Sequence, residues 1–222
     1  MSVAVVLFTS DLRVHDQPVL RAALRGAGEV VPLFVLDPGV RAAGFDAPNR
    51  RAFLADCLAS LDAGLRERGG RLVIRSGEVV EQVCRVVRES GARQVHVAAG
   101  VSRYAVRREE RLRTELTPMG CALDVHEAVV TAVPPGELTP AGGRDHFAVF
   151  TPYFRRWQAT GPRAVMTAPK AVRVPALDSD PLPERSAVSG VSPGLADGGE
   201  TVARARLTAI RVADSGAGCR SS

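Results

Sequence analysis

Apolar positions along the first 126 residues follow two alternating patterns. Runs rich in consecutive apolar and β-branched residues occupy positions 3–8, 30–36, 71–76, 94–98 and 122–126. Between these runs, apolar residues recur at helical spacing in segments that end at or near glycines. Continuous apolar runs are typical of strands buried on both faces, and the helical period is typical of amphipathic helices. The sequence therefore predicts a Rossmann-like, doubly wound α/β fold with a five-stranded parallel sheet.

Ligands of such sheets bind outside the carboxyl ends of the strands, where the strand order reverses. This rule selects the turns at 9–13, 37–38 and 99–104. Asp16 is placed to cap the helix that has Pro18 in its first turn. Neither a G-x-G-x-x-G turn after the first strand nor a Walker A sequence is present, which disfavours a conventional dehydrogenase or a P-loop NTPase.

Half of the ten aromatic residues lie in one stretch, FAVFTPYFRRW at 147–157. Pro152 suits the first turn of a helix, and Arg155 and Arg156 add a basic edge. On residue type alone, we expect this helix to close a hydrophobic core, with a ligand surface as the alternative.

The character of the chain changes after this helix. Residues 158–199 are rich in Gly, Pro and Ser, which predicts an extended or partly disordered linker. Residues 200–222 begin like a helix and end in a Gly- and Ser-rich tail, which suggests a truncated domain. The expected organisation is therefore an α/β domain over 1–157, a linker over 158–199 and a truncated helical start over 200–222.

Composition narrows the class of protein further. No apolar run approaches the roughly 20 residues that span a bilayer, and no signal peptide is evident, so we expect a cytoplasmic protein with no membrane partner. The net charge of +5 does not establish nucleic-acid binding. The four cysteines and four histidines are scattered, so we expect no metal site and no catalytic residue. The cysteines are Cys57, Cys84, Cys121 and Cys219, and the histidines are His15, His96, His126 and His146.

Three segments, in this order, resemble the DNA photolyase and cryptochrome family. LFTSDLRVHDQP at 7–18 resembles the family's opening strand and its Asp-Leu-Arg-x-x-Asp-Asn-Pro turn. Residues 136–157 are similar to the segment that ends in Val-Phe-Thr-Pro-Phe and a Trp. Residues 198–207 are similar to the Gly-Gly-Glu helix that leads into the family's helical domain.

The resemblance implies that residues 1–157 are the α/β domain that carries a light-harvesting antenna chromophore. The family's helical domain binds FAD and the damaged DNA, and the chain is expected to stop before it. The implied parent activity is light-driven repair of cyclobutane pyrimidine dimers by a photolyase. We expect the chain alone to lack this activity and to meet damaged DNA only through the missing domain. Under this interpretation, a separately encoded C-terminal half is a further candidate partner.

The resemblance also implies four chromophore-binding residues, which are Arg13, Asp37, Arg50 and Tyr104. Three of them have structural alternatives. Arg13 can pair with a neighbouring carboxylate, and Asp37 can close an Asp-Pro-Gly turn. Arg50, together with Arg51, can belong to the solvated start of a helix.

The folate-type Asn-Glu pair of the family is replaced by Arg107-Arg108, which favours 8-hydroxy-5-deazaflavin over folate as the antenna. Two rival functions remain open, a stand-alone chromophore- or nucleotide-binding module and the inert product of a truncated gene. Absorbance of the purified protein would separate these, since a bound antenna gives a near-ultraviolet or blue band.

Overall fold

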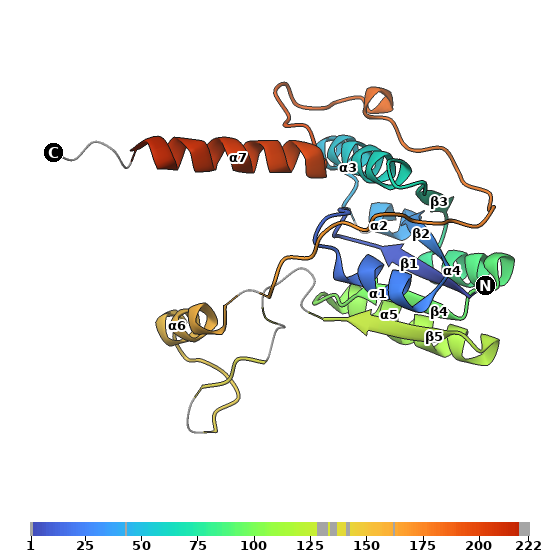
Figure 1. Cartoon of the computed structure of the whole chain (residues 1–222), viewed down its shortest axis with the longest axis horizontal. Helices are drawn as coiled ribbons and strands as arrows, with labels where there is room; N and C mark the ends of the chain where they lie inside the picture. Colours follow the sequence, from blue (N-terminus) through green and yellow to red (C-terminus); the bar gives the residue numbers. More distant parts are fainter. Residues whose placement is uncertain are drawn as a thin grey trace.

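The computed structural model describes residues 2–42, 44–127, 133, 137–140, 143–161 and 163–217. Five strands form one parallel sheet in the order β3-β2-β1-β4-β5, which confirms the predicted fold class (Figure 1). The strands are β1 (Val3–Phe8), β2 (Glu29–Leu36), β3 (Val73–Ser76), β4 (Gln94–Ala98) and β5 (Ala122–His126). The order reverses between β1 and β4, which is the switch point of the doubly wound arrangement.

Helices cover both faces of the sheet. The helices of the described residues are α1 (Pro18–Gly26), α2 (Pro38–Ala42), α3 (Pro48–Arg66), α4 (Val79–Ser90), α5 (Arg103–Leu116), α6 (Phe150–Thr160) and α7 (Glu200–Ala217), with short 3₁₀ turns at Thr117–Met119 and Arg185–Ala187. Side chains of α1 and α3 share one buried cluster with the sheet, and side chains of α4 and α5 share the other.

Period-two alternation along β1 explains why both clusters exist. Val5 and Leu7 belong to the cluster under α4 and α5, whereas Val6 and Phe8 belong to the cluster under α1 and α3. Successive side chains of a strand point to opposite faces, so a continuous apolar run supplies both layers. This is why the run is apolar throughout rather than alternating.

The cap of α1 differs from the prediction. Gln17 is the N-cap, and its side-chain oxygen accepts a hydrogen bond from the Val19 N–H. Asp16 has a φ of 52°, whereas an N-cap residue takes an extended conformation. Its carboxylate instead pairs with Arg163 and accepts from the Met166 N–H at 2.9 Å. Asp16 therefore ties the linker to the loop after β1.

The predicted linker covers 158–199, and its first three residues belong to α6. Residues 163–199 contain little regular structure and are packed against the α/β domain. Val172 is 1% exposed and belongs to the cluster under α1 and α3. Its N–H donates to the Arg68 carbonyl at 2.9 Å, and the Val30 N–H donates to the Arg173 carbonyl at 2.8 Å. These contacts make this segment a strap across the domain rather than a disordered connection.

The two helices that flank the linker project away from the sheet, α7 at the upper left and α6 at the lower left of Figure 1. Every residue of α6 is exposed, so the expectation that this aromatic helix closes a hydrophobic core is wrong. The helix forms because Pro152 and a strong local pattern favour it, but its apolar side meets no core of the described residues.

The cysteines, the possible metal ligands and the hydropathy of the helices complete the description. Cys57, Cys84 and Cys121 are free thiols, and Cys219 lies outside the described residues. The described part of the chain contains no cluster of three metal-ligating side chains. None of its helices combines the length and hydropathy that crossing a bilayer requires.

Candidate functional site

A large cavity of about 1670 Å³ opens at the carboxyl ends of β1, β2 and β3. The loop after β1, the first turns of α3, the linker around Glu184 and the first turns of α7 form its walls. Apolar side chains dominate the lining, among them Phe34, Leu36, Phe45 and Phe53. The site lies toward the β1–β2 side of the sheet, and residues 99–104 do not line it, although the topological rule selects them.

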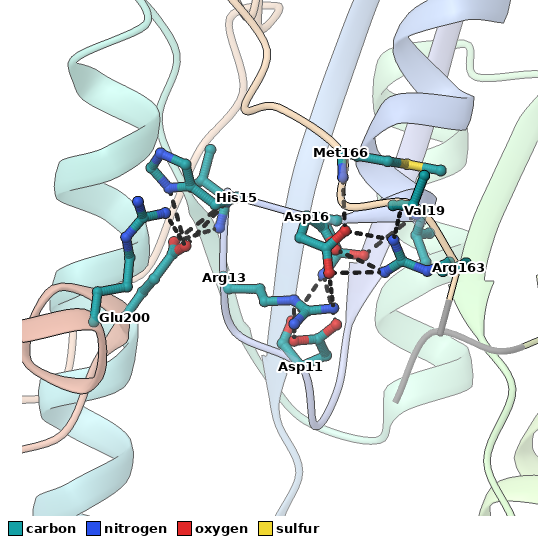
Figure 2. A network of polar contacts seen from close by, with 12 residues as sticks. Asp11, Arg13, His15, Asp16, Val19, Arg163, Met166 and Glu200 are labelled. Atoms are coloured by element: carbon teal, nitrogen blue, oxygen red, sulfur yellow. Dashed lines mark hydrogen bonds and ion pairs between the residues drawn. The ribbon is translucent and has the colours of Figure 1, made fainter. Parts of the chain in front are cut away.

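The loop after β1 carries a network of charges (Figure 2). The Arg13 guanidinium lies between two carboxylates, 3.1 Å from Asp11 and 3.5 Å from Asp16. Burial raises the pKa of Asp11, and Arg13 opposes that rise. The Arg163 hydrogen bond lowers the pKa of Asp16. Arg13 therefore pairs with neighbouring carboxylates, which is its structural alternative, and it also lines the cavity.

The same loop holds the first turn of α7. The Glu200 carboxylate accepts hydrogen bonds from the Val14 N–H at 2.8 Å and the His15 N–H at 3.1 Å. Its Oε1 also lies 3.0 Å from Nδ1 of His15, and Arg204 lies 3.9 Å away on the next turn. Figure 2 shows this cluster beside the Asp16 network. The start of α7 is thus fixed to the wall of the cavity.

Two glycines allow α7 to start there. Gly199 has a φ of 102°, and a Cβ at this position would lie 2.5 Å from Cβ of Ser60 on α3. A Cβ on Gly198 would lie 2.6 Å from the Phe53 carbonyl oxygen. Only residues without a side chain let the backbone approach α3 this closely and take this conformation.

Asp37 and Tyr104 meet above the ends of β2 and β4. The Tyr104 hydroxyl donates to Asp37 Oδ2 at 2.5 Å, and the Gly39 N–H donates to Asp37 Oδ1 at 2.7 Å. Partial burial, together with the Asp37 carboxylate, raises the pKa of Tyr104 to about 12. Asp37 lines the cavity, but Tyr104 does not. Tyr104 therefore positions Asp37 from outside.

Arg50 is the free cation of the site within the described residues. Its guanidinium lies 5.1 Å from the centre of the Phe45 ring, and no described carboxylate lies within ion-pair distance of it. The next residue, Arg51, pairs with Asp46 at 3.4 Å. Both arginines belong to the first turn of α3, where no side chain caps the helix. Arg50 is exposed at the start of α3, as its structural alternative expects, and it also lines the cavity, with no carboxylate partner among the described residues.

The structure brings Arg13, Asp37 and Arg50 to one cavity and places Tyr104 behind Asp37. Sequence reasoning missed Glu200 and the aromatic partner Phe45. The Gly-Gly-Glu segment signalled a helix start, but nothing in the sequence showed that its carboxylate would bind a loop 185 positions away.

The histidines are not all scattered. His96 on β4 and His126 on β5 lie on adjacent strands, with Nδ1 and Nε2 3.0 Å apart and the rings stacked. Asp124 lies 3.7 Å from His96. Burial lowers the pKa of both histidines. The sequence gap of 30 residues concealed this pair, which lies outside the cavity.

Comparison with known proteins identifies the family. The family model for DNA photolyase matches residues 4–175. The chain belongs to the DNA photolyase family. A deoxyribodipyrimidine photo-lyase of Streptomyces griseus is 66% identical over 209 residues, which cover 94% of this chain and 46% of the relative. A cryptochrome DASH of Natronomonas pharaonis is 30% identical, over 93% of this chain and 46% of that protein. The chain thus spans about half the length of these relatives.

Solved structures show the same fold. A cryptochrome of Synechocystis superposes with a TM-score of 0.77 at 20% identity, over 93% of this chain and 45% of that one. A class III photolyase of Agrobacterium tumefaciens gives 0.74 at 24% identity, over 86% and 39%. An archaeal photolyase of Sulfolobus tokodaii, described as holding two FAD molecules, gives 0.65 at 24%, over 78% and 38%. The described sheet and helices are therefore the α/β domain of this family.

The cavity fits an aromatic chromophore. Its volume exceeds that of ordinary small-molecule pockets, and its phenylalanines offer flat apolar surfaces. Arg50, which lies over the Phe45 ring, supplies a donor at the rim, and Asp37, which accepts from the Tyr104 hydroxyl, supplies an acceptor. This donor set suits a planar ligand with both carbonyl and N–H groups.

Proposed function

We propose that this chain is the chromophore-binding part of a photolyase that repairs DNA under light. The observation that carries the proposal is the apolar cavity in which Arg50 has no carboxylate partner among the described residues. Arg50 is exposed at the rim of the cavity, so its guanidinium can donate hydrogen bonds to a ligand there without losing a carboxylate partner among the described residues. The family membership supports a chromophore as the ligand.

The chain's own groups would hold a deazaflavin as follows. The phenylalanines at the cavity wall contact the ring faces, and Arg50 donates to a ring carbonyl. Asp37 accepts from a ring N–H, and Tyr104 keeps its carboxylate in place through the 2.5 Å hydrogen bond. We propose 8-hydroxy-5-deazaflavin rather than a folate, in line with the sequence-based expectation at Arg107-Arg108.

Repair itself requires groups that this chain does not supply. When bound, FAD supplies the electron that splits a pyrimidine dimer, and the antenna supplies excitation to it. We propose that FAD and damaged DNA bind to the other half of a photolyase-length protein, in the same or a separate polypeptide. The role of this chain is to orient the antenna, exclude water from it and hold the second half in place. We propose that the light-driven repair takes place in the cytoplasm.

The test is reconstitution of the purified chain with 8-hydroxy-5-deazaflavin and, separately, with methenyltetrahydrofolate, followed by absorbance and fluorescence titration. We expect the deazaflavin to bind more tightly. Arg50→Ala should weaken its binding by about tenfold or more, because hydrogen bonds to charged groups contribute about 1.5–3 kcal/mol. The matched control is Arg66→Ala at the other end of α3, which should bind normally.

Failure of both chromophores to bind would overturn the proposal. Tighter binding of the folate would overturn the choice of antenna. Equal affinity in the wild type and in Arg50→Ala would remove Arg50 from the site.

A further inference from the structure

The loop between β4 and α5 is held by a carboxylate from within α5. Glu109 reaches back along the helix, and its Oε1 accepts a hydrogen bond from the Gly100 N–H at 3.0 Å. The Glu109 side chain is only 13% exposed, so the bond is largely shielded from water. Ligands of doubly wound sheets bind beside such a loop, yet residues 99–104 do not line the cavity. The loop can therefore act on the cavity only through residues that it supports.

The loop packs directly onto the first turn of α5. A Cβ at Gly100 would lie 2.2 Å from Cβ of Ala105, so the backbone contacts the helix with no side chain between them. Ser102 caps the helix, and its side-chain oxygen accepts from the Ala105 N–H at 3.1 Å. At the other end of the loop, the Ala99 N–H donates to a carbonyl at the end of β5 at 2.9 Å. The loop and the start of α5 therefore form one packed unit.

Arg108 connects the same carboxylate to Tyr104. Its Nη2 lies 3.8 Å from Oε1 of Glu109, and its guanidinium carbon lies 5.9 Å from the centre of the Tyr104 ring. Arg108 is buried, and its Nε has no hydrogen-bond partner among the described residues. Burial lowers the pKa of Arg108, and the Glu109 carboxylate opposes that change. A buried cation is costly without a countercharge, and Glu109 supplies it here.

Tyr104 links this arrangement to the cavity. Its hydroxyl donates to Oδ2 of Asp37 at 2.5 Å, and Asp37 lines the cavity. Tyr104 follows the loop that Glu109 fixes, and its ring lies beside the cation that Glu109 neutralises. The Glu109 carboxylate thus acts on Tyr104 along two routes, one through the backbone of the loop and one through Arg108.

We propose that Glu109 is a positioning residue of the candidate chromophore site. It fixes the loop through Gly100 and balances the charge of Arg108, so that the Tyr104 hydroxyl stays on Asp37. Asp37 is then held at the rim with its acceptor oxygens in place for a ligand. The link to a chromophore rests on the proposed function, whereas the link from Glu109 to Tyr104 can be tested without a ligand.

The first test follows the ionisation of Tyr104 in the full chain without a ligand. All variants are made in a Tyr153→Phe background, which leaves Tyr104 as the only tyrosine. Burial and the Asp37 carboxylate raise the pKa of Tyr104 to about 12. Loosening of the ring weakens both effects, so Glu109→Ala should move the midpoint toward the ordinary value of 10. Glu109→Gln keeps an acceptor for the Gly100 N–H and should move the midpoint less.

Glu110 provides the matched control, because it is the next residue of α5 and is exposed. Glu110→Ala removes the same charge without touching the loop and should leave the midpoint unchanged. Amide exchange at Gly100 should accelerate about tenfold or more in Glu109→Ala and stay normal in Glu110→Ala. If Glu109→Ala does not fold by circular dichroism, Glu109→Gln decides, since Arg108 loses its countercharge there too. An unchanged midpoint in the folded variant, or an equal shift in Glu110→Ala, would overturn the proposal.

The second test adds 8-hydroxy-5-deazaflavin. Glu109→Ala should raise its Kd about 2- to 30-fold, the range typical of residues that do not contact the ligand. Because Glu109 acts through Asp37, adding Glu109→Ala to Asp37→Asn should weaken binding little further. Additive losses, or equal affinity in the wild type and Glu109→Ala, would overturn the positioning role and leave the proposed function standing. If the wild type binds no chromophore, the proposed function fails, and the Tyr104 midpoint still decides the role of Glu109.

Discussion

Glu200 and His15 are joined twice across 185 positions of the sequence. The Glu200 carboxylate accepts a hydrogen bond from the His15 backbone N–H at 3.1 Å and lies 3.0 Å from Nδ1 of its ring. One partner opens α7, and the other belongs to the loop that lines the cavity. The position of the candidate chromophore site and the direction of α7 are therefore set by the same contact.

Replacing Glu200 by Ala should release this loop. The N–H groups of Val14 and His15 lose their acceptor, so their hydrogen exchange should accelerate about tenfold or more, as expected for bonds to a charged group. Exchange at the centre of β1 should stay unchanged. Exposed Glu67 provides the control, since Glu67→Ala removes a carboxylate from the surface without touching the loop. Unchanged protection at Val14 in Glu200→Ala would contradict the assigned role.

Tyr104 should ionise late. Its pKa of about 12 means that the phenol stays neutral beyond its ordinary value of 10. In a Tyr153→Phe background Tyr104 is the only tyrosine of the chain, so absorbance near 295 nm reports its phenolate. Asp37→Asn removes the negative charge beside the hydroxyl, so the midpoint should fall part of the way toward 10. Burial remains in that variant, which is why the fall is partial. Equal midpoints would show that the Asp37 contact is absent in solution.

The partly buried pair of His96 and His126 should make the protein less stable in mild acid. Burial lowers the pKa of His96 and His126 below the ordinary value of 6.5. Below about pH 6.5 the unfolded chain binds protons that the folded chain resists, so the free energy of unfolding falls as the pH falls. The slope is at most about 1.4 kcal/mol per pH unit for each histidine.

Urea unfolding at pH 7.5 and pH 5.5 measures this effect. The difference between the two pH values should shrink in His96→Leu, because that variant has one titrating group fewer. His146→Ala, which alters an exposed histidine, should keep the wild-type difference. An undiminished difference in His96→Leu would assign the acid sensitivity to other groups.

The strap should contribute to the stability of the α/β domain. Val172→Ala removes two buried carbons from the cluster under α1 and α3 and should cost about 2 kcal/mol in the free energy of unfolding. Val165→Ala is the matched control, because Val165 is 82% exposed on the same linker. Urea denaturation compares them. Equal, small losses would mean that the strap is detached in solution.

The sequence by itself determined the sheet, its helices and the family. Strands such as 3–8 are apolar throughout because both faces are buried, and this local pattern can be read without knowing the neighbours. Three of the four expected site residues, Arg13, Asp37 and Arg50, reach one cavity because the carboxyl ends of parallel strands share an edge.

Only the tertiary structure decided how distant segments meet. Asp16 pairs with Arg163 rather than capping α1, Val172 enters the core from a Pro- and Gly-rich linker, and His96 meets His126. The aromatic helix at 150–160 has the composition of a core element but lies exposed. Composition shows how much apolar surface a segment can bury. The partner that buries it depends on contacts between residues far apart in the chain, and a local pattern carries no record of these.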